Sequence, residues 1–330
     1  MSNVIEVKKL SKTFKVKVKE KGFIGSLKSI IKPKYKTIKA VNNISFNVEK
    51  GEIIAFIGPN GAGKSTTIKM LTGILYKTQG SISVMGIDPT KKRKKLAYEI
   101  GIVFGQKEQL WTHLTPYDNF KFFGAIYDIP EYVVEKKIKE FIEIFELSEF
   151  INTPVRNLSL GQRIRCEIVA SLIHEPKILF LDEPTIGLDP VVKENIRTLI
   201  KRMNKEYKTT IFLTSHDVGD IEKLCKRVII INKGEVVLDD SMENLKHHYL
   251  NKKIIEVKMK EKVNVDDSKG ITILKDKGYN LKLEVDTKKT SISEALKKLD
   301  SDKIIDINIS NVPLESIITN IYKGEKWENI

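Results

Sequence analysis

Cysteine, tryptophan and long hydrophobic runs are scarce in this sequence. Its two cysteines, Cys166 and Cys225, lack the paired spacing of a zinc site, and a cytosolic disulfide between them is not expected. We predict two ordinary buried thiols. No apolar run approaches the roughly 20 residues that a membrane-spanning helix needs. Residues 1–10 lack the apolar core of a signal peptide, so we expect the chain to work in the cytosol.

Acidic residues are outnumbered by basic ones, which gives a formal net charge of +14. Nucleic acid and the anionic face of a membrane are the usual partners of such a surplus. A lysine-rich insertion at about residues 15–36 contains Phe23, Leu27, Ile30 and Ile31 at helical spacing. Two interpretations stay open for it. It is either a solvated insertion that packs on its own domain, or an amphipathic helix that lies against a membrane or a membrane partner.

The most specific motif is a phosphate-binding loop at residues 58–66, Gly-Pro-Asn-Gly-Ala-Gly-Lys-Ser-Thr. A strand-like run precedes it and a helix-like stretch follows, which separates it from a chance glycine-rich turn. The glycines let backbone N–H groups surround an anion, and the helix N-terminus adds partial positive charge. Lys64 is expected to reach the β- and γ-phosphates, and the Ser65 hydroxyl to hold Mg²⁺. The residues predicted to bind the nucleotide here are Gly58, Pro59, Asn60, Gly61, Ala62, Gly63, Lys64, Ser65 and Thr66.

Polar side chains follow three other apolar, strand-like runs, at residues 100–104, 177–181 and 210–213. In order along the chain, these side chains are Gln106, the pair Asp182 and Glu183, and His216. Open α/β sheets place ligand-handling residues at the carboxyl ends of their strands, which makes Asp182, Glu183 and His216 candidate site residues. Taken singly, each has an ordinary alternative: a surface glutamine, a solvated acidic turn and a structural histidine.

Local patterns predict further elements. Residues 4–7 alternate apolar with polar and predict an edge strand, whereas residues 110–157 are predicted to be mostly helical. A helix is expected at Arg163–Ile173. Beyond residue 240 the character changes to a small α+β domain without a chemical motif. Its predicted strands are residues 254–259, 281–285 and 304–309, and its predicted helices are residues 291–299 and 313–322.

Several stretches together resemble the nucleotide-binding subunit of ABC transporters. Besides the phosphate loop, Gln106 and His216, they are Leu-Ser-Leu-Gly-Gln at 158–162, Leu-Asp-Glu-Pro-Thr at 181–185 and Gly-Leu-Asp at 187–189. The resemblance covers residues 4–240. It implies an α/β fold, with a P-loop NTPase domain of the ABC type at residues 1–240. This domain would consist of a RecA-like core and a helical subdomain at about residues 107–170. The domain at residues 241–330, with Pro-Leu-Glu at 313–315, resembles ATPase subunits of the ABC-2 export type.

The resemblance implies a role for each candidate in the hydrolysis of ATP. Asp182, with Ser65 and Gln106, would bind Mg²⁺. Glu183 would take a proton from the attacking water, and His216 would contact the γ-phosphate and orient that water. Gln106 would contact Mg²⁺ or the water, and its loop would contact the membrane subunit.

The segment at residues 158–162 is implied to reach the ATP held by an opposite subunit. Ser159, Gly161 and Gln162 are the predicted ATP contacts, because a helix N-terminus favours phosphate. Leu160 stands where the family has a glycine, which puts the packing at the dimer seam in question. Asp189 is predicted to lie across the same seam.

Adenine is expected to stack on an aromatic ring upstream of the phosphate loop, which contributes about 1 kcal/mol. Tyr35 has the expected separation from Gly58, and Phe14 has the expected position relative to the first strand. We favour Tyr35, and Phe14 stays open.

The sequence therefore predicts the ATP-hydrolysing subunit of an ABC-2 exporter. Its dimerisation with ATP, as a homodimer, would drive a separate membrane permease, and the chain would lie at the inner face of the cell membrane. The alternative is a soluble ABC-type ATPase that acts on ribosomes or nucleic acid. A single phosphate loop and the lack of a heptad run disfavour that alternative, so no nucleic acid partner is expected.

Overall fold

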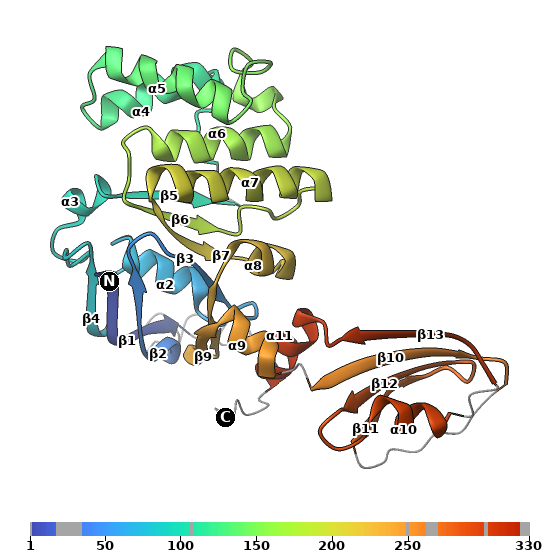
Figure 1. Ribbon diagram of the computed structural model, residues 1–330. Helices are drawn as coiled ribbons and strands as arrows, with labels where there is room; N and C mark the ends of the chain where they lie inside the picture. The colour runs from blue at the N-terminus through green and yellow to red at the C-terminus, as the bar shows by residue number, and fades with distance from the viewer. Residues whose placement is uncertain are drawn as a thin grey trace, which may run out of the picture. The chain divides into compact units, whose positions relative to one another are not determined.

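The computed structural model describes residues 2–17, 35–105, 108–248, 251–261, 270–299 and 303–323. The chain divides into two compact units, Met1–Asp239 and Asp240–Ile330 (Figure 1). Gln106 and most of the lysine-rich insertion lie outside the described residues. In the described part of the chain, no helix combines the length and the apolar character needed to cross a bilayer.

The centre of the first unit is a six-stranded sheet in the order β5-β6-β7-β3-β8-β9. The strands are β3 (Ile53–Ile57), β5 (Ile100–Phe104), β6 (Ile178–Asp182), β7 (Thr210–Thr214), β8 (Arg227–Asn232) and β9 (Glu235–Ser241). Strands β5, β6, β7, β3 and β8 are parallel, and their register sets Asp182 opposite Thr214. Parallel strands covered on both faces require nearly continuous apolar residues, which is why these runs stood out in the sequence.

A second, antiparallel sheet in this unit has the order β2-β1-β4. It consists of β1 (Asn3–Lys17), β2 (Tyr35–Glu49) and β4 (Gln79–Val84). The prediction of an edge strand at residues 4–7 is wrong, because β1 pairs with β2 on one side and with β4 on the other. An antiparallel strand with one solvated face alternates apolar with polar residues whether it is central or at an edge, so the pattern could not decide its place.

Aromatic side chains join the two sheets into one core. The ring of Phe46 on β2 lies 5.6 Å from that of Phe56 on β3 and 6.2 Å from that of Phe212 on β7. Phe180 on β6 extends the row, 5.5 Å from Phe212. Helix α2 (Lys64–Leu71) contributes buried side chains to the same cluster. The phosphate loop therefore connects a strand and a helix that are both fixed in the core.

A helical segment projects beyond β5 and β6, in the upper part of Figure 1. It contains α4 (Pro116–Ile126), α5 (Glu131–Ile144), the short 3-10 turn η1 (Val155–Asn157) and α6 (Leu160–Leu172). Helix α6 begins at Leu160 and not at the predicted Arg163. The reason is a capping box, in which the Ser159 hydroxyl accepts the N–H of Gln162 while the Gln162 side chain accepts the N–H of Ser159.

Three further helices complete the first unit. They are α3 (Arg93–Ala97), α7 (Pro190–Tyr207) and α8 (Val218–Leu224). Asp189 caps α7 and Asp217 caps α8, since their carboxylates accept backbone N–H groups of the first turn.

The second unit contains a four-stranded antiparallel sheet in the order β11-β12-β10-β13. Its elements are α9 (Met242–His248), β10 (Lys252–Met259), β11 (Ile271–Asp276), β12 (Asn280–Asp286), α10 (Ile292–Lys297), β13 (Ile304–Asn311) and α11 (Leu314–Lys323). Helix α10 packs through Ala295 on a core of Ile255, Leu283 and Val285.

Helix α6 carries a buried acid, Glu167, which is only 5% exposed. Burial raises the pKa of Glu167 to about 7, although the N–H of Gln109 and the charge of Arg163 act in the opposite direction. The protonated form is therefore favoured by the folded chain.

We predict a loss of stability with rising pH that Glu167→Gln removes. A carboxyl whose pKa is raised by folding contributes fully below its unfolded pKa, and the contribution is lost as pH rises from about 4.5 to about 7. At about 1.4 kcal/mol for each pKa unit, the loss is at most about 3.5 kcal/mol. Denaturant unfolding at pH 5, 6, 7 and 8 measures it. The same pH slope in both chains would contradict the prediction.

Candidate active site

The phosphate loop follows β3 and is shaped by two close approaches. A Cβ on Gly63, whose φ is +112°, would lie 2.6 Å from the carbonyl oxygen of Ala40, and one on Gly58 would lie 2.1 Å from the oxygen of Ile231. Only glycine fits at either position. The Lys64 ammonium, which is buried, donates to the carbonyl oxygen of Gly58 at 2.6 Å. Burial lowers the pKa of Lys64, although the charges of Glu183 and Asp182 act in the opposite direction.

Asp182 and Glu183 occupy the carboxyl end of β6. The Asp182 Oδ1 accepts a hydrogen bond from the Thr214 hydroxyl at 2.6 Å. Glu183 has a φ of +58°, a left-handed conformation that non-glycine residues adopt at a cost. Its N–H donates to the carbonyl oxygen of Thr214 at 3.0 Å, which stabilises this turn. Sequence reasoning missed Thr214, whose only signal was a hydroxyl at the end of an apolar strand.

His216 brings the loops after β3, β6 and β7 together. Its Nε2 lies 2.9 Å from Glu183 Oε1 and 3.2 Å from Lys64 Nζ. One ring nitrogen can donate to the carboxylate or accept from the ammonium, but not both at once. These three predicted residues therefore meet, and a cavity of about 250 Å³ opens beside Glu183 and His216.

The residues present fit a magnesium ion. Mg²⁺ takes oxygen ligands and is commonly held by one or two protein groups together with substrate phosphates. The exposed Ser65 hydroxyl and the Asp182 carboxylate supply such oxygens. No cluster of three or more acidic, histidine or cysteine side chains suited to a metal occurs among the described residues. A site of this kind depends on the nucleotide for the remaining ligands.

The segment at residues 158–162 forms the first turn of α6 and packs on α7. A Cβ on Gly161 would lie 2.5 Å from Val192 Cγ1, so a larger residue would separate the two helices. The Leu160 side chain is 41% exposed, and its Cδ2 lies 3.3 Å from the position that a Cβ on Gly187 would take, so the two residues are close neighbours. Asp189 accepts the N–H groups of Val191 and Val192 at 3.0 Å, so it has a capping role within its own chain.

Comparison with known proteins identifies the family. Residues 41–186 match the family described as ABC transporter. The ABC transporter ATP-binding protein NatA of Bacillus subtilis (strain 168) is 35% identical over 212 residues, 64% of this chain and 86% of NatA. The chain belongs to the ABC transporter ATP-binding proteins.

The names of other relatives in this family refer to different transport systems. Linearmycin resistance ATP-binding protein LnrL of Bacillus subtilis (strain 168) is 38% identical over 207 residues, covering 63% of this chain and 66% of LnrL. Energy-coupling factor transporter ATP-binding protein EcfA2 of Clostridium perfringens (strain 13 / Type A) is 35% identical over 273 residues, 80% of this chain and 93% of EcfA2. A solved dimer of the ATP-binding cassette MJ0796, bound to ADP and Pi, aligns with a TM-score of 0.60 and 26% identity, over 72% of this chain and 98% of that one.

These findings confirm the main prediction. The chain has the fold of an ABC-type P-loop ATPase and is an ATP-hydrolysing subunit of an ABC transporter, whose partners are a membrane permease and a second ATPase subunit. They do not support the alternative of a ribosome or nucleic acid ATPase.

The register of the first sheet bears on which aromatic ring, Phe14 or Tyr35, is the better candidate for the predicted stacking on adenine. Phe14 on β1 pairs with Ile38, two residues from Ala40, whose oxygen touches the phosphate loop at Gly63. At about 3.3 Å for each strand residue, Phe14 lies about 7 Å along the strand from that contact, and Tyr35 about 17 Å. Tyr35 is also 60% exposed. The geometry therefore favours Phe14 over the Tyr35 that we favoured from the sequence.

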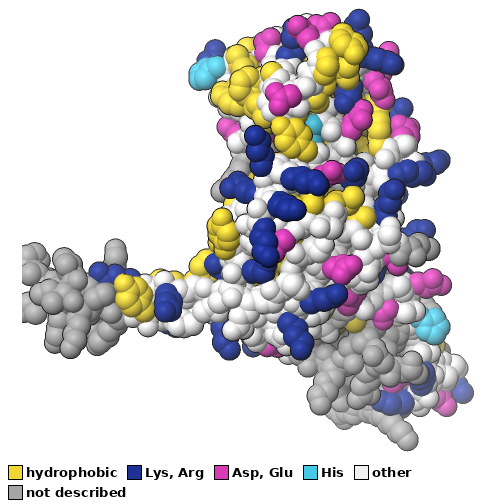
Figure 2. Space-filling model, turned by 90° about the vertical axis from the view of Figure 1, so that its left-hand side faces the viewer, with side chains coloured by type: hydrophobic (Ala, Val, Ile, Leu, Met, Phe, Trp, Pro, Cys, Tyr) yellow, Lys and Arg dark blue, Asp and Glu magenta, His cyan; other side chains and the backbone are white. Residues whose placement is uncertain are grey.

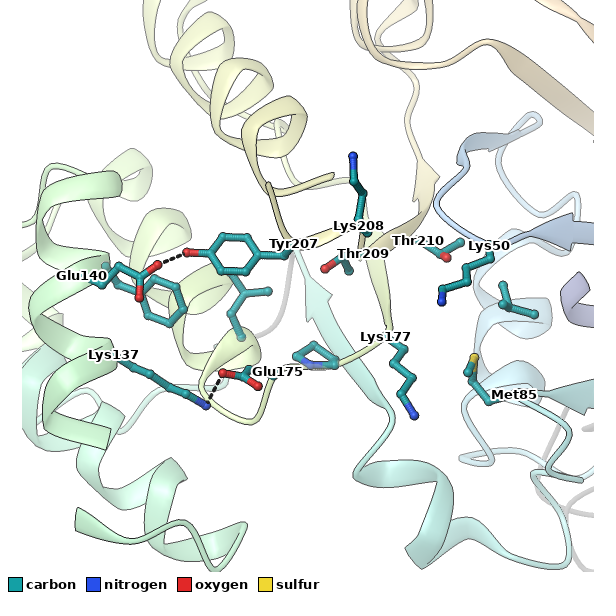
Figure 3. Close-up of a pocket in the computed structure, with 14 residues that line it drawn as sticks. Lys50, Met85, Lys137, Glu140, Glu175, Lys177, Tyr207, Lys208, Thr209 and Thr210 are labelled. Atoms are coloured by element: carbon teal, nitrogen blue, oxygen red, sulfur yellow. Dashed lines mark hydrogen bonds and ion pairs between the residues drawn. The ribbon is translucent and has the colours of Figure 1, made fainter. Parts of the chain in front are cut away.

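A further cavity lies away from the nucleotide site. It has a volume of about 320 Å³ and lies beside Lys177 and Thr210, at the amino ends of β6 and β7 (Figure 3). Its walls are mainly apolar, with Phe141 and Leu172 among them. The catalytic loops leave the opposite, carboxyl ends of the same strands, so this cavity is on the other edge of the sheet.

We predict that Phe14→Ala weakens ATP binding, whereas Tyr35→Ala does not. Loss of one stacked ring costs about 1 kcal/mol, or about fivefold in Kd. Titration of each chain with a fluorescent ATP analogue measures it. If Tyr35→Ala weakened ATP binding and Phe14→Ala did not, Tyr35 would be the better candidate for the ring that stacks on adenine.

Proposed function

We propose that this chain is the Mg²⁺-dependent ATPase of an ABC-2 type exporter, working as a homodimer at the inner face of the cell membrane. The observation that carries the ATPase part is the convergence of Lys64, Glu183 and His216. The relative named for linearmycin resistance supports export, which is one way in which a cell resists a drug. Energy-coupling factor transporters are a second candidate class, favoured by the high coverage of EcfA2.

Hydrolysis follows from the chemistry of these groups. The loop N–H groups and Lys64 bind the phosphates and balance their charge. As the oxygen of a water molecule attacks the γ-phosphorus, Glu183 accepts a proton from that water. The bond between the γ-phosphorus and the oxygen that leaves with ADP breaks. His216, between Glu183 and the phosphate, orients that water. Bound Mg²⁺, with oxygens of Ser65 and Asp182 as ligands, supplies further positive charge. Ser159 and Gly161 at the start of α6 complete the site of an opposite subunit.

We predict that Glu183→Gln binds ATP without hydrolysing it and accumulates as an ATP-bound dimer. The amide cannot take the proton, whereas the phosphate contacts of Lys64 stay in place. Size-exclusion chromatography with ATP, together with phosphate release, measures both effects. Lys64→Ala is the control, and its nucleotide binding itself should weaken. A Glu183→Gln chain that stays monomeric with bound ATP would contradict the two-subunit site.

A groove between the core and the helical segment supports a permease contact. A cavity of about 190 Å³ is lined by Ile74 and Arg93 from the core side, and by Phe123 of α4 and Tyr127 directly after it. Two side-chain nitrogens at its wall, Nε2 of Gln109 and Nδ1 of His174, are buried without a hydrogen-bond partner. Gln109 also lies three residues after Gln106, whose loop was predicted to contact the membrane subunit.

The surface beside this groove has the composition of a docking site. Trp111 and Phe122 are 47% and 40% exposed, and their rings lie 4.1 Å apart. The exposed basic run at residues 91–95 belongs to α3 and the turn before it. Figure 2 looks onto this side, with hydrophobic side chains gathered above and lysine and arginine side chains below them. We propose that an apolar permease helix binds the aromatic pair, while the basic run faces acidic residues or anionic lipid.

We predict that Phe122→Glu loses binding to native membranes. Inside-out vesicles from the source cells, compared with protein-free liposomes of the same lipids, separate a permease from a lipid contact in a flotation assay. Val237→Glu is the matched control, because Val237 is also 40% exposed and lies on β9. ATP hydrolysis in solution should be unchanged in both variants. Equal binding of the Phe122→Glu and Val237→Glu chains to native vesicles would overturn the docking proposal.

A further inference from the structure

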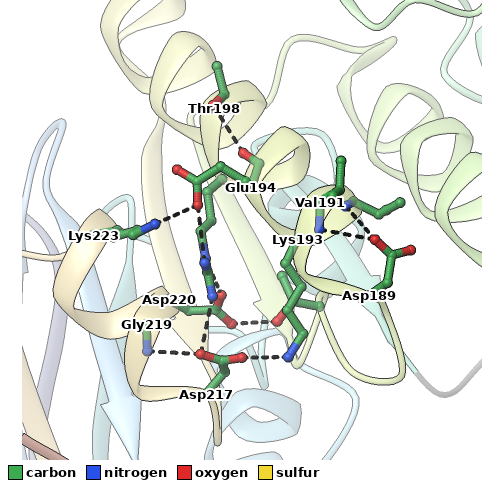
Figure 4. Close-up of polar contacts among 12 residues, drawn as sticks. Asp189, Val191, Lys193, Glu194, Thr198, Asp217, Gly219, Asp220 and Lys223 are labelled. Atoms are coloured by element: carbon green, nitrogen blue, oxygen red, sulfur yellow. Dashed lines mark hydrogen bonds and ion pairs between the residues drawn. The ribbon is translucent and has the colours of Figure 1, made fainter.

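A buried ion pair lies beside the catalytic loops (Figure 4). Arg197 on α7 is 8% exposed, and its Nε lies 2.7 Å from Oδ1 of Asp220 on α8, which is fully buried. The pKa of Arg197 is raised overall, so the guanidinium stays charged. Burial by itself would lower this pKa, but the hydrogen bond to Asp220 and its charge outweigh the effect of burial. Removing two charges from water is costly, so stability alone is a weak account of such a pair.

Asp220 joins the loops that follow two catalytic strands. Its Oδ2 accepts a hydrogen bond from the Thr185 hydroxyl, two residues after Glu183. The same oxygen accepts one from the Ser215 hydroxyl at 2.6 Å, directly before His216. Thr185 and Ser215 are both buried. A single carboxylate oxygen therefore fixes the loop of the catalytic base to the loop of the histidine.

Arg197 also fixes the residue on the other side of His216. One of its terminal nitrogens lies 3.1 Å from Oδ1 of Asp217. The second oxygen of Asp217 lies 2.5 Å from the ammonium of Lys193, which is also on α7. Ser215 therefore bonds to Asp220 of the ion pair, and Asp217 bonds to two side chains of α7. The imidazole of His216, between these two residues, lies against Glu183.

We propose that Arg197 and Asp220 are a positioning pair that sets the distance between His216 Nε2 and the Glu183 carboxylate. The proposal rests on the ATPase function proposed above and assigns that reaction two further residues. Neither residue is part of the phosphate loop. Loosening the pair would let the loops after β6 and β7 shift, which slows the hydrolytic step while ATP still binds to Lys64.

Mild variants test this without removing the buried charges. Ser215→Ala and Thr185→Val each delete one hydroxyl bond to Asp220, and Arg197→Lys keeps the charge but loses the planar fork. We expect kcat for ATP to fall about 10- to 100-fold, as for a small misplacement of a catalytic group, with Kd for ATP nearly unchanged. Thermal melting shows whether each variant is folded. If the Arg197→Lys chain does not fold, the Thr185→Val chain still tests the proposal.

A double-mutant cycle separates positioning from a merely structural role. In a His216→Ala chain, adding Ser215→Ala should lower kcat little further, because the group it positions is already gone. Lys223→Ala is the matched control: Lys223 pairs at 2.7 Å with Glu194 at the exposed end of the same network and should leave kcat unchanged. Additive losses in the double variant, or an equal loss in the Lys223→Ala chain, would overturn the proposal. An unmodified chain without ATPase activity would instead refute the proposed function itself.

Discussion

The structure depends on the parallel alignment of β3, β6 and β7. Each strand is almost wholly buried, and all three end at the same edge of the sheet. The side chains that follow the strands are therefore brought together although they lie far apart in the sequence. Lys64, Glu183 and His216 come from positions more than a hundred residues apart at the extremes and meet within 3.2 Å. Core packing between Phe56, Phe180 and Phe212 holds the strands in this register. The chemistry is therefore a consequence of how the core packs.

A second constraint operates where α6 meets α7. The first turn of α6 carries the segment predicted to reach ATP on another subunit, and its position is set by close contact of Gly161 with Val192. Leu160, which departs from the family's glycine, is partly exposed and lies next to Gly187. Helix α7 thus contacts this segment at its start and holds the ion pair with Asp220 further along. The segment at residues 158–162 and the catalytic loops are predicted to belong to the two halves of a composite site, and α7 contacts both.

Many of the site residues could be predicted from the sequence, because the patterns that indicate them lie within short stretches of the chain. A glycine-rich loop between an apolar strand and a helix has few alternatives, and acids after an apolar run mark a strand end. Side-chain partners are not local. Asp220 lies 35 residues from Thr185, and nothing in the charges of α7 and α8 distinguishes the buried Arg197 from exposed neighbours such as Lys201. Likewise, separation along the chain favoured Tyr35 for adenine, whereas pairing across β1 and β2 favours Phe14.

The sequence by itself determined the apolar strands that end at the site, the phosphate loop, the acidic pair and the histidine, because each depends on the periodicity and residue types of a short stretch. The tertiary structure alone decided the central place of β1, the start of α6 at a capping box, and the network around Asp220. These features depend on which segments pack against one another, and hydrogen bonds and close contacts between distant residues leave no pattern in the chain that forms them.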